Sequence, residues 1–282
     1  YLMNLKNIIP KDGPSIEEAE KYIDKYKNEY ICIKVGGSVL NDKSLFKILL
    51  EDISILKKLN LNPILIHGGG KKLTNKLNEL NIQTDFIDGL RITSQKVISI
   101  AEDVFIRFNK EIVDTLKYNS SNAVGITSKE NNIIYVKTIK KELGYVGTPS
   151  KIDVFFLKKI IEENKIPVIA PLGLDSNKKV YNVNADEVGT SIASALKARR
   201  LLIVSNVEGV MKKNNLISEI NSTTAEEMLA NSEISGGMVP KVKNAISIAD
   251  KVKGVVIISG IKLHSILFEL FSDKGSGTLI RK

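Results

Sequence analysis

The feature that most constrains the fold of this 282-residue chain is an alternation of short apolar runs with longer amphipathic segments, which starts at Tyr30. The runs are bounded by Gly, Asn or Pro, which is typical of buried strands. Strands that alternate with helices form a largely parallel sheet with helices on both faces. The sequence therefore predicts an α/β fold. Six runs have this character: 30–35, 63–67, 133–136, 166–170, 201–205 and 255–259.

Five of these runs lead directly into clusters of Gly, Asn or small residues. The carboxyl ends of parallel strands lie at one edge of an open sheet, and ligands bind at that edge. We therefore expect the clusters to gather there and form the active site.

Composition and charge exclude some classes of protein. With 43% hydrophobic residues, the chain can bury a large core, which excludes disorder as its main state. A formal charge of +9 would suit a polyanionic partner. The lysines, however, concentrate on amphipathic segments such as 51–59 and 71–80, where solvated helix faces account for them. We therefore expect no nucleic-acid partner.

Cys32 is the only cysteine, and its neighbours Ile31 and Ile33 predict a buried thiol on a strand. A reducing cytosol fits a chain that cannot form an intramolecular disulfide. No apolar run approaches the roughly 18 residues of a membrane span, and the first residues lack the layout of a signal peptide. We expect a cytoplasmic protein without a membrane partner.

Residues 1–14 show no periodicity, so we expect a loose lead-in. Ser15 and Glu18 have the spacing of a capping box, which predicts the start of an N-terminal helix. The polar segment 175–179 interrupts the pattern and favours a boundary between two lobes. The predicted units are an N-terminal extension with its helix (1–29), an N-lobe (30–178) and a C-lobe (179–282).

The first glycine cluster is segment 34–38, Lys-Val-Gly-Gly-Ser, which ends the first run. Gly36 and Gly37 would let backbone N–H groups approach an anion, while Lys34 would supply a mobile positive charge. A tight strand-to-helix turn without a ligand remains the alternative.

The second cluster is segment 67–70, His-Gly-Gly-Gly, which ends the second run. Gly69 and Gly70 open a helix near Lys71, so exposed amides would form an anion site. The spacing excludes a Walker A loop and a dinucleotide fingerprint, which disfavours a Rossmann oxidoreductase. His67 could act as a base, but a structural histidine at the strand end is the favoured interpretation.

Polar side chains stand out in two further segments. In segment 88–93, Asp-Gly-Leu-Arg-Ile-Thr, a glycine turn presents Arg91, whose guanidinium suits a carboxylate; an ordinary surface arginine is the alternative. In segment 182–186, Asn-Val-Asn-Ala-Asp, three polar residues alternate. An extended backbone would place Asn182, Asn184 and Asp186 on one face that could hold a ligand. The alternative is a loop with Asp186 as a helix N-cap.

The last motifs lie in the final third of the chain. Segment 235–241, Ser-Gly-Gly-Met-Val-Pro-Lys, predicts a glycine turn and a helix that starts near Pro240. Lys241 in its first turn would oppose the helix dipole, so a nearby polyanion would compensate for it. Segment 205–210, Ser-Asn-Val-Glu-Gly-Val, follows a strand and is either a nucleotide-binding loop or a simple connector.

Taken in order, these motifs resemble those of the amino-acid kinase superfamily, and within it the acetylglutamate kinases, from about residue 20 to residue 280. The resemblance implies a three-layer αβα sandwich with a mainly parallel central sheet. It also implies ATP-dependent phosphorylation of the side-chain carboxylate of N-acetyl-L-glutamate, in arginine biosynthesis. The shared motifs are Lys-x-Gly-Gly, His-Gly-Gly-Gly, Gly-Leu-Arg-x-Thr, Asn-Val-Asn-Ala-Asp and Gly-Gly-Met-x-x-Lys.

The resemblance also implies a role for each motif. Lys34 and Lys241 would stabilise charge on the transferring phosphoryl group, and Asp186 would orient both lysines. Positioning and electrostatics would then carry the rate without a general base. The N-lobe would hold acetylglutamate, and the residues that bind it would be Gly69, Gly70, Arg91 and Asn182. The C-lobe and the first loop would bind ATP, accompanied by Mg²⁺, through Gly36, Gly37, Ser205, Gly209, Gly236, Gly237 and Met238. No metal held by the protein itself is expected.

Two positions depart from the family pattern: Asn206 and Ser94 stand where Asp is usual, and neither is among the residues implied to stabilise charge on the phosphoryl group. Two related functions remain as alternatives, a kinase for another acyl substrate such as carrier-linked aminoadipate, and a non-catalytic arginine sensor. The motif around Arg91 favours acetylglutamate. Lys34, Lys241 and Asp186 argue against an inactive protein.

The helix before the first strand resembles the N-terminal helix of arginine-sensitive members, although Glu20 and Lys21 replace the usual Leu-Pro. Segment 264–280 resembles the C-terminal segment of the same arginine site. The resemblance implies arginine as an effector and a hexamer built as a trimer of dimers. The alternative is that residues 15–29 only cap the sheet. The implied effector site consists of Tyr22, Glu269, Gly275 and Gly277.

Overall fold

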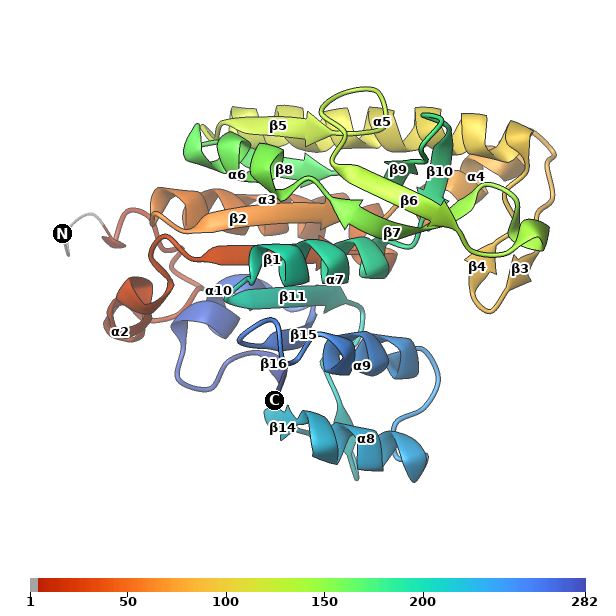
Figure 1. Ribbon diagram of the computed structural model, residues 1–282. Helices are drawn as coiled ribbons and strands as arrows, with labels where there is room; N and C mark the ends of the chain where they lie inside the picture. Colours follow the sequence, from red (N-terminus) through yellow and green to blue (C-terminus); the bar gives the residue numbers. More distant parts are fainter. Residues whose placement is uncertain (1–4) are drawn as a thin grey trace.

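The computed structural model describes residues 5–282, and residues 1–4 lie outside the described part of the chain. A central sheet has the strand order β14-β16-β15-β11-β1-β2-β8-β5 (Figure 1). Its strands pair in parallel, except for β15 with β16. The predicted α/β fold is confirmed. The strands are β1 (Tyr30–Val35), β2 (Asn62–His67), β5 (Ala123–Ile126), β8 (Ile166–Ile169), β11 (Arg200–Ser205), β14 (Glu219–Asn221), β15 (Val255–Ser259) and β16 (Gly277–Arg281).

Helices cover both faces of this sheet, which makes three layers (Figure 1). One face packs against α2, α3, α5 and α10, and the opposite face packs against α6, α7, α8 and α9. Helix α4 packs against α5. The helices are α2 (Ile16–Tyr26), α3 (Lys43–Lys58), α4 (Gly70–Glu79), α5 (Gln95–Tyr118), α6 (Val154–Glu162), α7 (Ala185–Leu196), α8 (Ser222–Ala230), α9 (Met238–Ser247) and α10 (Ser265–Phe271), with 3-10 segments η1 (Gly37–Asn41) and η2 (Lys141–Leu143).

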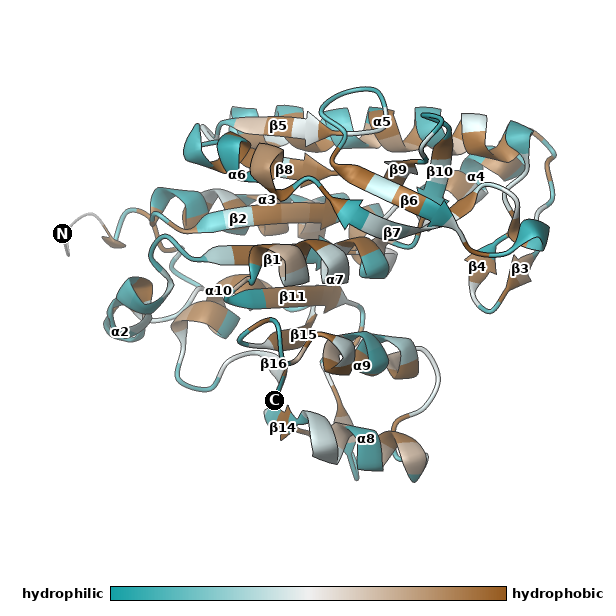
Figure 2. Ribbon diagram, in the orientation of Figure 1, coloured by the Kyte–Doolittle hydropathy of each residue, from teal (hydrophilic) through white to brown (hydrophobic). Residues whose placement is uncertain are grey.

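Side chains of the central strands alternate between the two faces, and both faces are buried. Ile31 and Ile33 pack with α3 and α5, whereas Cys32 between them packs with α6 and α7. All three are fully buried, which confirms the predicted core position of the thiol and raises its pKa. Burial of each apolar side chain of this size stabilises the fold by about 1.5–3 kcal/mol. In Figure 2, the central strands are mostly brown, while teal residues mark the outer helix surfaces.

The run 133–136 does not join the main sheet, so its predicted place there is wrong. It forms β6 in a four-stranded sheet that closes on itself. In β6, Ile134 and Val136 are buried while Tyr135 between them is exposed, a period of two that marks a strand with one covered face. The strands of this second sheet are β6 (Ile134–Thr138), β7 (Val146–Ile152), β9 (Leu172–Leu174) and β10 (Val180–Val183). Two small hairpins pair β3 (Phe86–Ile87) with β4 (Leu90–Arg91) and β12 (Met211–Lys212) with β13 (Asn215–Leu216).

The polar segment 175–179 forms the turn between β9 and β10. The Asp175 carboxylate accepts hydrogen bonds from the backbone N–H groups of Asn177 at 2.9 Å and Lys179 at 2.8 Å. The main sheet continues across the expected lobe boundary, because β1 pairs with β11. The division into lobes at residue 178 stays a prediction.

The N-terminal helix begins where the capping box predicts. The Ser15 hydroxyl accepts a hydrogen bond from the backbone N–H of Glu18 at 3.2 Å and donates one to its carboxylate at 3.3 Å. The expected loose lead-in is wrong for the described residues, because Leu5 and Ile9 are only 2% and 6% exposed. Both pack into the core beside α2 and α3, a tertiary contact that leaves no periodic pattern in a short segment.

Within residues 5–282, no helix is both long enough and apolar enough to cross a membrane.

Candidate active site

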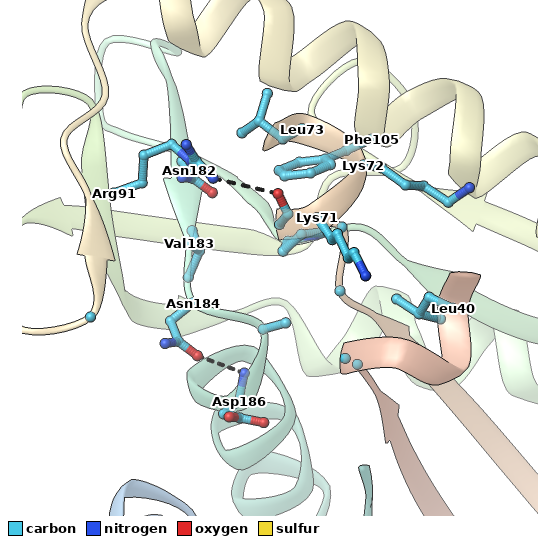
Figure 3. Close-up of a pocket in the computed structure, with 18 of the residues that line it drawn as sticks. Leu40, Lys71, Lys72, Leu73, Arg91, Phe105, Asn182, Val183, Asn184 and Asp186 are labelled. Carbon is cyan, nitrogen blue, oxygen red and sulfur yellow. Dashed lines mark hydrogen bonds between the residues drawn. The ribbon is translucent and has the colours of Figure 1, made fainter. Parts of the chain in front are cut away.

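The glycine clusters after β1 and β2 lie side by side at the carboxyl end of the main sheet. This follows from the strand order, because β1 lies between β2 and β11. Val35 is paired with His67 on one side and with Val204 on the other. A cavity of about 540 Å³ lies at this edge (Figure 3). The predicted site residues that line it are Lys34, Gly36, Gly37, Gly69, Gly70, Arg91, Asn182 and Asp186.

Asp186 lies between two lysines that come from distant parts of the chain. Its Oδ1 is 2.7 Å from Nζ of Lys34 at the end of β1, and its Oδ2 is 3.8 Å from Nζ of Lys241 in α9. The side chains of Lys34 and Lys241 are 10% and 19% exposed, so water screens these ion pairs less than it would at the surface. The structure thus brings the three predicted catalytic residues together.

The charge of Asp186 is maintained by these neighbours. Burial alone would raise the pKa of Asp186, but the ammonium groups of Lys34 and Lys241 outweigh burial and hold the pKa below its ordinary value. The carboxylate therefore stays ionised at neutral pH and keeps two positive charges close to the cavity.

Asp186 is in the first turn of α7, where the helix dipole favours a carboxylate. It is not the helix N-cap, because the side chain of Asn184 accepts the hydrogen bond from the backbone N–H of Asp186 at 2.8 Å (Figure 3). The expectation that Asn182, Asn184 and Asp186 share the face of an extended segment is therefore wrong, since β10 ends at Val183. The helix turn instead aims Asp186 at the lysines.

Gly36 and Gly37 shape the loop after β1. A Cβ atom at Gly36 would lie 2.5 Å from Nζ of Lys34, so glycine is needed for the lysine to lie across the loop. Gly37 has a φ of +68°, in the left-handed region that favours glycine. These two positions let the chain turn from β1 into η1 beside the cavity.

The second cluster opens α4, with Gly69 as its N-cap and Gly70 as its first residue. A Cβ atom at Gly69 would lie 2.5 Å from the nearest ring atom of Phe105, so the loop and α5 pack in close contact. Gly69, Gly70 and Lys71 at this helix start line the cavity, and the free N–H groups of a helix N-terminus can bind an anion.

His67 is a structural histidine, as the sequence favoured. It is fully buried, its Nδ1 donates to the carbonyl oxygen of Gly68 at 2.7 Å, and its Nε2 accepts from the side chain of Asn109 at 3.1 Å. Burial lowers the pKa of His67 to about 4, so the ring is neutral and its two nitrogens are occupied.

Arg91 is held at the end of the β3–β4 hairpin, whose turn residues Asp88 and Gly89 both have positive φ. Its guanidinium donates to the hydroxyl groups of Thr84 at 2.5 Å and Thr74 at 2.6 Å. It also lies 4.6 Å from the centre of the exposed Phe86 ring.

Arg91 is 8% exposed, and burial lowers its pKa. Within residues 5–282, no carboxylate forms an ion pair with it. A buried cation held only by neutral groups is suited to an incoming carboxylate. Asn182, which donates to Thr93 at 3.4 Å, lines the same cavity.

The predicted ATP-binding residues divide into three groups. Gly36 and Gly37 line the main cavity, whereas Gly209 and Met238 line a neighbouring cavity of about 400 Å³. The two cavities meet at the loop after β11, because Asn206 lines the first and Val207 lines the second. The remaining three, Ser205, Gly236 and Gly237, line neither cavity.

Some lining residues were not predicted. Lys71 and Lys72 extend from the first turn of α4, and Asn41, Phe86 and Phe105 also line the cavity. A signal for the lysines was present in the sequence, since they follow His-Gly-Gly-Gly directly. Their place in an amphipathic segment made a solvated helix face the simpler interpretation.

The described residues include no group of three or more His, Cys, Asp or Glu side chains that could hold a metal ion. Of the residues that the structure describes, Asp186 is the only one that brings a carboxylate to the lining of the main cavity, and two lysines neutralise it. This donor set does not fit a metal ion held by the protein itself, because hard cations such as Mg²⁺ prefer several free oxygen ligands.

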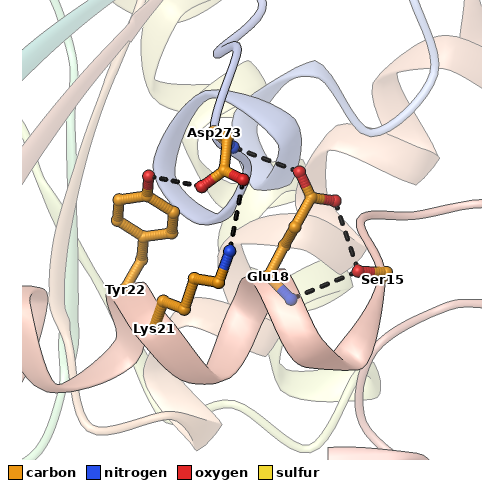
Figure 4. Close-up of polar contacts among 5 residues, drawn as sticks. All are labelled: Ser15, Glu18, Lys21, Tyr22 and Asp273. Atoms are coloured by element: carbon orange, nitrogen blue, oxygen red, sulfur yellow. Dashed lines mark hydrogen bonds and ion pairs between the residues drawn. The ribbon is translucent and has the colours of Figure 1, made fainter.

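A third cavity, of about 510 Å³, lies at the other end of the strands, between α2 and the C-terminal segment. All four residues of the implied effector site line it: Tyr22, Glu269, Gly275 and Gly277. Figure 4 shows how α2 contacts this segment: the Tyr22 hydroxyl donates to Asp273 at 2.8 Å, and Lys21 forms an ion pair with it at 3.3 Å.

Glu269 is placed in this cavity by its neighbours. Its carboxylate accepts a hydrogen bond from the backbone N–H of Ser276 at 2.7 Å. A Cβ atom at Gly275, whose φ is +66°, would lie 2.8 Å from the same carboxylate. Burial raises the pKa of Glu269.

The sequence and fold match a known family. The model of the amino acid kinase family matches residues 29–259, which span both glycine clusters, Asp186 and Lys241. The chain therefore belongs to the amino acid kinase family.

Similar proteins within this family share one name. The acetylglutamate kinase of Pelagibacter ubique is 57% identical over 99% of this chain and 97% of its own length. The acetylglutamate kinase of Caldanaerobacter subterraneus is 38% identical over 94% of this chain and 91% of its own length.

Solved structures agree in fold at lower identity. The N-acetylglutamate synthase of Neisseria gonorrhoeae, complexed with coenzyme A and L-arginine, has a TM-score of 0.82 at 21% identity, over 94% of this chain and 64% of that one. The carbamate kinase of Giardia lamblia bound to AMP-PNP has a TM-score of 0.68 at 15% identity, over 90% of this chain and 99% of that one.

Proposed function

We propose that the protein transfers the γ-phosphoryl group of ATP to the side-chain carboxylate of N-acetyl-L-glutamate. The products are N-acetyl-L-glutamyl 5-phosphate and ADP, and the reaction belongs to arginine biosynthesis. The observation that carries the proposal is the cluster of Lys34, Asp186 and Lys241 beside the cavity that Arg91 lines. The acetylglutamate kinases that resemble the chain over almost its whole length support the same reaction.

The chemistry needs positioning and charge more than proton transfer. A carboxylate oxygen of acetylglutamate forms a bond to the γ-phosphorus, and the bond from phosphorus to the bridging oxygen of ADP breaks. The attacking carboxylate is ionised at neutral pH, so no general base is required. Lys34 and Lys241 stabilise the negative charge that spreads over the phosphoryl oxygens, and Asp186 holds both lysines in place.

Each substrate has its own side of the site. Arg91, Asn182 and the amides of Gly69 and Gly70 bind acetylglutamate in the main cavity. ATP enters with its Mg²⁺ as a substrate complex, with its phosphates beside Gly36 and Gly37 and its base in the neighbouring cavity lined by Gly209 and Met238. Ser205, Gly236 and Gly237 support the loops that border this second cavity.

A single assay identifies the acceptor. Purified protein is incubated with MgATP and acetylglutamate, glutamate, aspartate or aminoadipate, and hydroxylamine traps any acyl phosphate. The proposal expects a hydroxamate from acetylglutamate at a rate at least about tenfold above the others, since the other acceptors leave polar groups of the cavity unpaired. A faster reaction with another acid would assign the cavity to that substrate.

Arginine is the proposed effector, bound in the cavity between α2 and the C-terminal segment. Glu269 suits a guanidinium group, while Lys25 and Arg200, which line the same cavity, suit a carboxylate. We further propose a cytoplasmic hexamer, a trimer of dimers assembled through α2.

The regulatory proposal is tested by one variant that leaves α2 folded and by one that removes it. In Tyr22→Phe the ring stays and only the hydrogen bond to Asp273 is lost, so half-inhibition should need at least about threefold more arginine, since a hydrogen bond to a charged group contributes more than 1 kcal/mol. Deleting residues 1–26 should abolish both inhibition and the hexamer. A wild-type dimer in light scattering whose activity ignores millimolar arginine would contradict this proposal and leave the kinase activity untouched.

A further inference from the structure

Two lysines beside the second glycine cluster have no part in the proposed mechanism. Lys71 and Lys72 are in the first turn of α4, which contains no acidic residue, and both line the main cavity. Among residues 5–282, neither forms an ion pair. A cation in this position is disfavoured by the helix dipole, and adjacent lysines repel each other. An anion in the cavity would compensate for both effects.

The two side chains point in different directions (Figure 3). Nζ of Lys72 lies 4.2 Å from the centre of the Phe108 ring, a cation–π contact that draws it aside. Lys71 instead extends across the cavity toward η1, the segment that begins at Gly37 and carries Leu40. It therefore reaches from the loop of Gly69 and Gly70, proposed to bind acetylglutamate, toward the loop of Gly36 and Gly37, proposed to bind the phosphates.

The charge of the cavity supports the same conclusion. Its lining contains one carboxylate, Asp186, and four cations: Lys34, Lys71, Lys72 and Arg91. Lys34 is paired with Asp186, and Arg91 is held by threonine hydroxyls. Lys71 is thus an exposed ammonium group that can move onto a ligand between the two loops.

We propose that Lys71 is a third phosphate-binding cation, which contacts the transferring phosphoryl group from the acetylglutamate side. This inference rests on the proposed phosphoryl transfer. The attacking carboxylate and the γ-phosphoryl group are both anions, and a cation placed between the two loops reduces their repulsion as the new bond forms. Lys71 exchanges no proton in this step.

The test compares Lys71→Ala and Lys71→Arg with Lys76→Ala. Lys76 is on the same helix, pairs with Glu79 at 2.8 Å and does not line the cavity, so it controls for the loss of one lysine. Lys71→Ala should lower kcat about 10- to 100-fold, and KM for acetylglutamate should change less than about threefold, because the contact belongs to the transition state. Lys71→Arg should recover most of kcat, and Lys76→Ala should match the wild type.

A binding measurement separates this role from a structural one. Lys71→Ala should weaken a complex with MgADP, aluminium fluoride and acetylglutamate by the same factor as kcat, while the affinity for a MgATP analogue alone should stay unchanged. Equal kcat in Lys71→Ala and Lys76→Ala, or equal loss of both affinities, would overturn the inference. If the wild type forms no hydroxamate from acetylglutamate, the proposed function fails and the inference fails with it.

Discussion

The main cavity and the cavity beside α2 have similar volumes, about 540 and 510 Å³, but different charges. The main cavity has four cations and one carboxylate in its lining. The cavity beside α2 has three of each in its lining: Lys25, Arg200 and Lys274, with Glu219, Glu269 and Asp273. An excess of positive charge suits a polyanion whose negative charge is redistributed during reaction, whereas balanced charge suits a zwitterion that only binds.

The two cavities also lie at opposite ends of the same strands. Arg200 begins β11 and lines the cavity beside α2, whereas Asn206 follows the end of β11 and lines the main cavity. No side chain lines both. Any effect of one ligand on the other must therefore pass through a shift of packed elements, and it is limited by the preference of each ligand for one conformational state.

The largest expected effect is in the main cavity. Lys241→Ala should lower kcat at least about 100-fold, which is about 2.7 kcal/mol of lost transition-state stabilisation. Steady-state kinetics measures the loss, and circular dichroism checks that the variant is folded. Lys251→Ala, a change at an exposed lysine, is the control. A folded Lys241→Ala enzyme with nearly normal kcat would remove this lysine from the mechanism.

Arg91→Lys tests the acetylglutamate side. The lysine keeps the charge but loses the planar fork, and charge-assisted bonds of this kind contribute about 1.5–3 kcal/mol, so KM for acetylglutamate should rise at least about tenfold. KM for ATP should change little. A rise confined to KM for ATP would show that the two substrate sides are assigned the wrong way round.

Glu269→Gln tests the cavity beside α2. Loss of the carboxylate should raise the arginine concentration for half-inhibition at least about fivefold, since a bond to a charged group contributes more than 1 kcal/mol. Without arginine, kcat should stay within about twofold of the wild type, because the main cavity is unchanged. The exposed Glu163→Gln serves as control. Equal sensitivity in both variants would place the effector elsewhere.

The smallest effect concerns the pair that anchors the start of α10. Nδ1 of His264 lies 2.6 Å from Asp52, and its Nε2 lies 3.2 Å from Asp12. Burial raises the pKa of Asp52 to about 6, and the hydrogen bond to Asp52 raises the pKa of His264. Both folded-state pKa values lie above their unfolded values, so the stability from both groups is present in acid and is lost as pH rises through the folded values.

Urea unfolding of the wild type and Asp52→Asn at about pH 4.5 and pH 8 measures this effect. The stability advantage of the wild type should decrease with rising pH, by on the order of 1 kcal/mol. An advantage that grows with pH would show that the pair is held mainly by ionised Asp52.

The two regions also differ in how far the sequence predicts them. The main cavity follows from strand order, because residues at the ends of β1, β2 and β11 meet once these strands pair. The position of Asp186 did not follow from the alternation of polar residues. The strand β10 ends at Val183, and the N-cap Asn184 starts α7, so Asp186 is in a helix and not in an extended segment.

Other features depend on contacts that no local pattern encodes. Leu5 and Ile9 are ordered by packing under α2, and β6 joins a second sheet although its composition resembles that of a core strand. Lys71 follows the periodicity of a solvated helix face, and only its place in the lining of the main cavity distinguishes it from Lys76 on the same helix.

The central claim is direct phosphoryl transfer beside Lys34, Asp186 and Lys241, and a single turnover tests it most directly. Excess wild-type or Lys34→Ala enzyme is mixed with γ-labelled MgATP and acetylglutamate, then quenched at short times. The account predicts label passing from ATP to acetylglutamyl phosphate with none on the protein, and transfer at least about 100-fold slower in Lys34→Ala. Label on the protein before product, or equal rates in the two enzymes, would contradict it.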